Sequence, residues 1–183
     1  MSKLETNTID TISGTTNLVI GSTNSSTVTF ESGAATGHMY PAFEAYLSSN
    51  QTPSNATYTK IEFDTEVFDT DNAYDNSTNY RFTPQVAGKY FVTAHLQTEV
   101  ADDSLIDGII RIYKNGSAYK RARDNPRNGG GERQVILHTT AIIDMNGSSD
   151  YLEVLGYVNV TAATGIFTSE EKGTYFSAYR IGA

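Results

Sequence analysis

The chain of 183 residues contains no cysteine and no tryptophan, and it has no long apolar run. Without cysteine, no disulfide can hold it together, which excludes the small disulfide-stapled modules found among secreted proteins. A membrane-spanning helix requires ~18 or more consecutive apolar residues, and no stretch approaches that length. The N-terminal sequence MSKLETNTID lacks the apolar core of a signal peptide. We therefore expect neither membrane insertion nor an export signal.

Positive charge is also scarce. The chain has 13 Lys and Arg residues against 21 Asp and Glu residues, which gives a formal net charge of -8. Because nucleic-acid binding rests largely on positive charge that neutralises phosphates, this balance argues against general nucleic-acid binding. We expect no nucleic-acid partner.

No window of the chain shows a convincing helical period, whereas signals for β-strands are frequent. The 12 Tyr and 8 Phe residues, with many Thr and Val, favour strands. The pair Asn115-Gly116 indicates a tight hairpin, and Gly88 to Gln97 alternates between two faces. Roughly eight to ten strands separated by turn signals predict an all-β sandwich of two antiparallel sheets. One predicted core face of the alternating run comprises Tyr90, Val92, Ala94 and Leu96.

Residues 1–38 differ in composition from the rest, being rich in Ser, Thr, Gly and Asn. Two short apolar runs, Leu18 to Ile20 and Val28 to Phe30, predict a pair of short strands. We interpret 1–38 as a short extended β segment that serves as an attachment or stalk, ordered by contact with other subunits; a flexible tail is the alternative. The predicted globular domain spans 39–183.

The stretch from Phe68 to Tyr90 resembles a motif of the globular head of complement C1q, in the C1q/tumour-necrosis-factor (TNF) jelly-roll superfamily. The opening Ala42-Phe43-Glu44-Ala45 and the closing Phe176-Ser177-Ala178-Tyr179 are also similar to that family. Val92, Asn79 and Ala178 depart from its usual residues, but these are local changes in volume. The matching motif residues are Phe68, Asp69, Tyr74, Asp75, Ser77, Thr78, Phe82, Thr83, Pro84, Gly88 and Tyr90.

This resemblance implies a compact homotrimer in which one sheet of each subunit packs against its neighbours. The alternation agrees, because three strands carry apolar and tyrosine side chains opposite their predicted core positions. An ordinary sandwich with surface tyrosines is the alternative. The predicted trimer interface comprises Phe91, Thr93, His95, Tyr151, Leu155, Tyr157, Tyr175, Tyr179 and Ile181.

Catalytic and metal-binding motifs are missing. The histidines, His38, His95 and His138, match no zinc spacing, and there is no G-x-S-x-G, P-loop or G-x-G-x-x-G motif. We predict that the protein is not an enzyme and has no cofactor and no metal site. A glycan-cleaving enzyme with paired carboxylates remains an alternative.

Two acidic clusters leave calcium as a further alternative to solvated loops, because hard cations prefer several oxygen ligands. The resemblance adds to this, since some complement-family members bind calcium near the top of the trimer. The first cluster comprises Glu62, Asp64, Glu66, Asp69, Asp71 and Asp75, and the second comprises Asp102, Asp103 and Asp107.

Over half of the 13 basic residues lie between positions 111 and 133. The predicted ligand-binding residues are Lys120, Arg121, Arg123 and Arg127, because arginine favours bidentate contacts with oxyanions such as those of cell-surface sugars. The alternative is that these side chains point outward from strands and pair with nearby Asp and Glu.

The leader in 1–38 resembles the Ser/Thr/Gly leaders of bacteriophage tail-fibre and head-fibre proteins. We therefore expect a non-enzymatic virion protein, made in the host bacterial cytoplasm, whose trimeric knob attaches to the host surface. Its expected partners are itself, another virion protein through 1–38 and a host cell-surface glycan. A capsid decoration or cement protein without a ligand and a bacterial C1q-like lectin or adhesin are the alternatives.

Overall fold

The computed structural model describes residues 41–126 and 132–182. The predicted stalk 1–38, its boundary at 38/39 and the candidate ligand residue Arg127 lie outside these residues. No helix within the described residues is long and apolar enough to cross a membrane.

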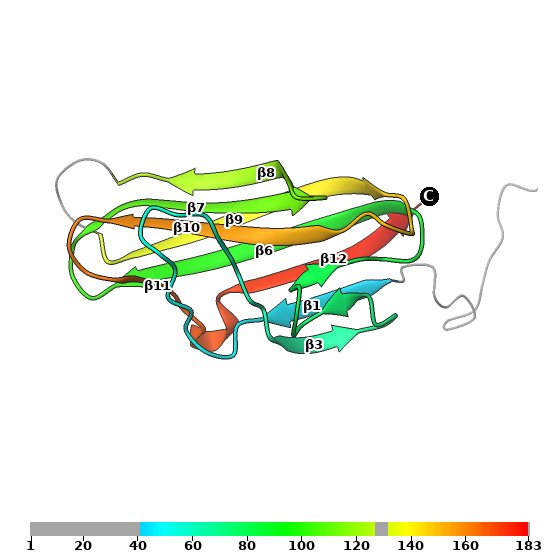
Figure 1. Cartoon of the computed structure of the whole chain (residues 1–183), viewed down its shortest axis with the longest axis horizontal. Coiled ribbons are helices and arrows are strands. Elements are labelled where there is room, and N and C mark those ends of the chain that lie inside the picture. The colour runs from blue at the N-terminus through cyan, green and yellow to red at the C-terminus, as the bar shows by residue number, and fades with distance from the viewer. Residues whose placement is uncertain (1–40, 127–131, 183) are drawn as a thin grey trace, which may run out of the picture. The chain divides into compact units, whose positions relative to one another are not determined.

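The described residues form two antiparallel sheets that enclose one apolar core (Figure 1). This arrangement confirms the predicted all-β sandwich. We call the first sheet A. Its strands, in spatial order, are β9 (Gln134–Met145), β6 (Gly88–Val100), β12 (Tyr175–Gly182), β1 (Ala42–Tyr46) and β3 (Thr65–Asp69), with β11 (Gly165–Phe167) beside the end of β6.

Sheet B contains the remaining strands, and its outermost member is a strongly basic hairpin strand. A short 3-10 helix, Glu170–Lys172, precedes β12. The strands of sheet B are β8 (Ser117–Asp124), β7 (Leu105–Lys114), β10 (Leu152–Val160), β2 (Thr59–Lys60), β5 (Arg81–Phe82) and β4 (Tyr74–Asp75).

The central strand of sheet A is β6, which pairs with β9 along one edge and with β12 and β11 along the other. Its alternation follows the prediction, because the four side chains of the predicted core face are completely buried. Residues that pair directly across antiparallel strands place their side chains on the same face. The register of β6 therefore decides which side chains of β9 and β12 face outward. The inward residues are Tyr90, Val92, Ala94 and Leu96, as predicted, followed by Thr98 and Val100.

An aromatic cluster fills the core between the sheets. The ring of Phe43 stacks on Tyr74 with centroids 4.7 Å apart and meets Phe176 edge-on at 4.9 Å. Phe82 lies 4.5 Å from Phe43, so the β5 motif residue and the β1 motif residue meet in the core. The Tyr74 hydroxyl donates a hydrogen bond of 3.1 Å to the carbonyl of Phe63, which satisfies its polar end. The large aromatic residues of the segments that resemble the C1q/TNF family, Phe43, Tyr74, Phe82 and Phe176, thus meet in the core, whereas Phe68 of the same motif is 46% exposed.

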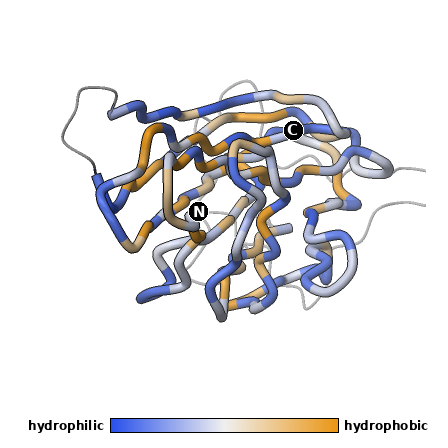
Figure 2. Tube along the Cα trace, turned by 60° about the vertical axis from the view of Figure 1, so that its left-hand side comes forward, coloured by the Kyte–Doolittle hydropathy of each residue, from blue (hydrophilic) through white to orange (hydrophobic). Residues whose placement is uncertain are grey.

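The predicted Asn-Gly hairpin joins β7 to β8. Asn115 has φ 52° and Gly116 has φ 75°, the left-handed pair that a two-residue type I′ turn requires. Figure 2 shows β8, the uppermost strand in that view, to be largely hydrophilic, in contrast to the apolar segments beneath it. The hairpin therefore presents a polar strand at the edge of sheet B.

Candidate functional site

The outward face of sheet A carries a row of four ring side chains, one from each of four neighbouring strands. Tyr46 pairs with Tyr175, Tyr175 with His95, and His95 with His138. The rings of His95 and Tyr175 are nearly parallel, with centroids 5.3 Å apart, and those of His95 and His138 are 6.1 Å apart. Three of the four rings are half-buried, whereas His138 is exposed and its ring is tilted by 46° to that of His95.

Next to this row, the face is more exposed and more apolar. Tyr179 pairs with Phe91, and Phe91 pairs with Ile142. The exposed fractions of Ile136 and Ile142 are 59% and 57%, and Ile181 is 45% exposed. We call these side chains, together with the ring row, the sheet A face. Isolated surface apolar residues are ordinary, but a contiguous group of them marks an interaction surface.

Two polar contacts lie within the sheet A face. The Nδ1–H of His95 donates to the carbonyl of Gly173, which fixes the orientation of that ring. Thr93 Oγ1 lies 2.8 Å from His138 Nε2. These contacts hold the polar members in place, so that the face can be covered without leaving their hydrogen bonds unmade.

The nine predicted interface residues do not share one face. Phe91, Thr93, His95, Tyr175, Tyr179 and Ile181 lie together on the sheet A face. Tyr151, Leu155 and Tyr157 belong to or adjoin β10 and lie on the opposite, outward side of sheet B. Their grouping with Phe91 is wrong, because alternation tells which residues face outward but not which sheet a strand joins.

Each of these three residues already has a neighbour on the sheet B side of the sandwich. The guanidinium of Arg81 lies over the Tyr151 ring at 4.7 Å. Leu155 pairs with Arg111, and the ring of Tyr157 lies 5.0 Å from that of Tyr58.

Other members of the sheet A face were not predicted from the sequence. The run from Arg133 to Met145 alternates as clearly as β6, and this pattern could have identified its outward residues. Tyr46 required knowledge that β1 lies beside β12. The missed residues are Tyr46, Ile136, His138 and Ile142.

The predicted ligand-binding residues differ in whether an acidic side chain pairs with them. Arg123 donates to both carboxylate oxygens of Asp107, at 2.9 and 2.6 Å, and the Asp107 side chain is only 8% exposed. Arg133 pairs with Asp103 at 2.9 Å. Arg123 thus has the paired outward position of the alternative, and Arg133, a basic residue of the same stretch outside the predicted set, is paired in the same way. Lys120 and Arg121 lie exposed on β8 and form no ion pair with another described residue.

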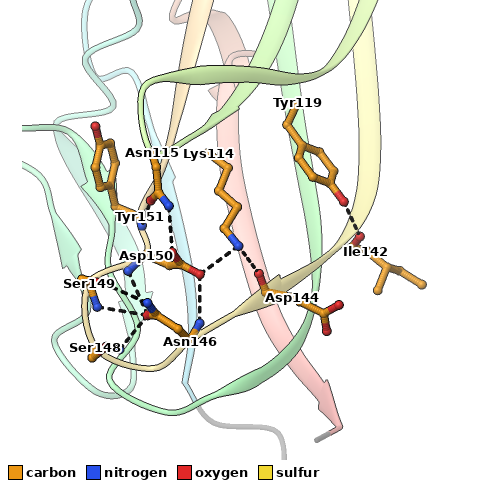
Figure 3. A network of polar contacts seen from close by, with 10 residues as sticks. All are labelled: Lys114, Asn115, Tyr119, Ile142, Asp144, Asn146, Ser148, Ser149, Asp150 and Tyr151. Carbon is orange, nitrogen blue, oxygen red and sulfur yellow. Dashed lines mark hydrogen bonds and ion pairs between the residues drawn. The ribbon is translucent and has the colours of Figure 1, made fainter.

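A polar network fixes the hairpin against the end of β9 (Figure 3). Lys114 Nζ forms an ion pair of 2.8 Å with Asp150 and donates a hydrogen bond of 2.6 Å to the backbone carbonyl of Asp144. Asn115 Nδ2 also donates to Asp150, at 2.7 Å. The ammonium of Lys114, followed by the amide of Asn115, lowers the pKa of Asp150. The hairpin is thereby tied to the strand that carries Ile142.

The acidic clusters close loops. Asp64 accepts from the backbone and hydroxyl of Ser48, and Asp69 accepts from the backbone N–H of Tyr74 at 2.7 Å. Asp75 accepts hydrogen bonds across the turn from Ser77 to Asn79. Among residues 41–126 and 132–182, no three His, Asp or Glu side chains group in a way that could hold a metal ion. Calcium binding stays an untested alternative.

Known proteins resemble this chain in fold more than in sequence. No protein-family model matches it. The uncharacterized protein YqcC of Bacillus subtilis (strain 168) is 32% identical over 111 residues, which are 56% of this chain and 28% of YqcC. The chain thus spans less than a third of that relative's length.

Two solved structures share the architecture. Murine APRIL at pH 5.0 matches with a TM-score of 0.58 and 10% identity, over 79% of this chain and 100% of that one. Eiger TNF from S. frugiperda matches with a TM-score of 0.51 and 9% identity, over 77% and 92% of the respective chains. The chain therefore has the C1q/TNF-like jelly-roll fold that its motifs predicted.

The acid stability of the protein tests the role of Asp75. Hydrogen bonding, chiefly from the backbone N–H of Thr78, holds the pKa of Asp75 well below its ordinary value of 3.8. The stability that Asp75 contributes is fully present above that ordinary value and is lost as the pH falls below it. Asp75→Asn should lower the free energy of unfolding at neutral pH and flatten its decline between about pH 5 and pH 3. Urea denaturation at several pH values measures both.

Asp71→Asn is the matched control, since Asp71 is exposed and its carboxylate accepts no hydrogen bond from a described residue. Identical acid dependence of the two variants would show that Asp75 does not close the turn.

Proposed function

We propose that this chain is a non-enzymatic virion protein whose jelly-roll domain forms a trimeric knob on a phage tail fibre or head fibre. The observation that carries the proposal is the sheet A face, where Ile136, Ile142 and Ile181 stand exposed beside the rings of Tyr175 and Tyr179. Leaving this apolar surface in water costs free energy, and its burial between copies of the chain removes that cost. Enrichment in aromatic residues is typical of the centres of interfaces.

A second copy of the chain is the expected occupant of this face for two reasons. The fold is C1q/TNF-like, and the resemblance of the motif to complement heads implies a threefold assembly. The face also lies on strands that are rigidly held, since β6 pairs over its full length with β9. Three copies of one chain can close into a ring when the rotation between neighbouring copies closes, so a threefold assembly can bury this face in every subunit.

If the trimer is displayed on a virion, it can attach the particle to its host. The Ser/Thr/Gly-rich leader in 1–38 would join the knob to another virion protein. Three identical hairpins on each knob, repeated over many fibres, turn weak single contacts with a host glycan into strong attachment. A decoration or cement protein would use the same trimer without a ligand.

Sedimentation of the intact chain tests the trimer. We expect the unmodified protein to sediment as three chains and Ile142→Asp to sediment as one, because a carboxylate at the centre of an apolar interface loses its hydration without gaining a partner. Val86→Asp is the control: Val86 is exposed on the loop before β6, and the variant should remain trimeric. An unmodified protein that sediments as a monomer overturns the proposal.

Immunogold electron microscopy of particles from a producing culture tests whether the protein is part of a virion. Antibodies raised against the trimer should label the tail or head of phage particles. Label confined to the bacterial cell surface would contradict the virion role and favour the lectin or adhesin alternative.

A further inference from the structure

Two arginine side chains meet without a counter-charge on the outward face of sheet B. Arg111 on β7 and Arg121 on β8 are direct partners across the hairpin. Like charges directly opposite one another on antiparallel strands are destabilising. Neither guanidinium forms an ion pair with a carboxylate of residues 41–126 or 132–182. The pair therefore raises the free energy of the folded chain unless something neutralises it.

The neighbouring Arg123 provides a comparison within the same hairpin. It faces the buried carboxylate of Asp107 and makes two hydrogen bonds to it. Sheet B thus supplies an acidic partner for one arginine and leaves Arg111 and Arg121 without one.

Arg111 is held in place and is incompletely satisfied. Its guanidinium lies 4.0 Å from the centre of the Tyr58 ring, a cation–π contact. Its Nε is buried and has no hydrogen-bond partner, which costs free energy until a partner arrives. Burial raises the pKa of Tyr58, an effect that Arg111 partly offsets, so the phenol is neutral at ordinary pH and supplies no counter-charge.

A surface depression of about 250 Å³ opens at this pair. Besides the two arginines it is lined by Lys120, Tyr119 and Ala118. This volume is below the range of pockets that enclose whole drug-sized ligands. The depression can therefore hold one charged group and part of the sugar or other residue to which that group is attached. Exposed Lys and Arg on an edge strand also resist edge-to-edge pairing, but that role does not call for Arg111, which lies on the inner strand of the hairpin.

We propose that this depression binds a singly charged oxyanion carried by a polymer of the host envelope, with Arg111 and Arg121 as its ligands. Guanidinium groups bind carboxylate and phosphate oxygens through paired N–H donors, so either oxyanion fits. The choice of an envelope polymer rests on the proposed attachment function; the oxyanion chemistry rests on the site alone. The chain has a formal net charge of -8, so the positive charge of this site contrasts with the negative charge of the chain as a whole.

Isothermal titration of the intact chain tests the site with two small probes, glycerol phosphate and glucuronate, and with uncharged glycerol as the blank. We expect at least one charged probe to bind, more weakly at higher salt. Arg121→Gln should weaken that binding at least tenfold, and Arg111→Gln should do the same. Arg133→Gln removes equal charge from an exposed ion pair elsewhere and should change binding less than twofold.

Binding of glycerol phosphate alone, or of glucuronate alone, supports the site and tells which envelope polymer carries the anion. Absence of binding by either probe to a trimeric, folded protein overturns the site and favours the cement alternative, while the trimer stands. Equal loss of binding in Arg133→Gln and Arg121→Gln also overturns it, because only general charge is then involved. Binding by a protein that sediments as a monomer keeps the site and contradicts the proposed knob.

Discussion

The alternation of β6 is the constraint on which the rest of the structure depends. Its 13 residues pair with β9 along nearly their whole length on one side, and with β12 and then β11 on the other. Every second side chain is sealed in the core, and Tyr90 satisfies its buried hydroxyl by donating 2.8 Å to the carbonyl of Val86. A slip of one residue would turn Phe91 and His95 into the core and expose Tyr90. The register that makes the core is thus the register that makes the sheet A face.

The sandwich separates two chemistries onto its two outward surfaces. The sheet A face is apolar and ring-rich, which suits association with an identical surface. The hairpin of β7 and β8 carries cations, which suit a charged ligand. The network of Lys114, Asp144 and Asp150 joins that hairpin to the end of β9. Self-association and ligand binding can therefore coexist on one small domain, because neither surface has to yield to the other.

Most of the fold could be predicted from local signals in the sequence. The hairpin followed from Asn115-Gly116, since few residue pairs accept two successive left-handed conformations. One face of the core could be predicted from the alternation of Tyr90, Val92, Ala94 and Leu96, all of which are buried. Strand alternation gave the outward residues of β6 and β12 correctly.

Non-local facts could not be predicted. Tyr157 faces outward as expected but on the other sheet, because strand order is a property of the whole topology. Arg123 is neutralised by Asp107, a residue 16 positions earlier, and only the β7–β8 register brings the two together. The ring row from Tyr46 to His138 likewise requires the order of four strands. In the sequence, Arg111 is only one of several cations. That it lacks a counter-charge can be seen only when the structure shows which residues surround it.

The central claim is that the sheet A face meets copies of itself. The absence of cysteine allows single spin labels to be placed at Thr140→Cys, outward on sheet A, and at Asn159→Cys, outward on sheet B. Pulsed electron spin resonance then measures label-to-label distances between subunits. The account predicts shorter distances for position 140 than for position 159. Shorter distances at position 159, or no intersubunit coupling at either position, would contradict it.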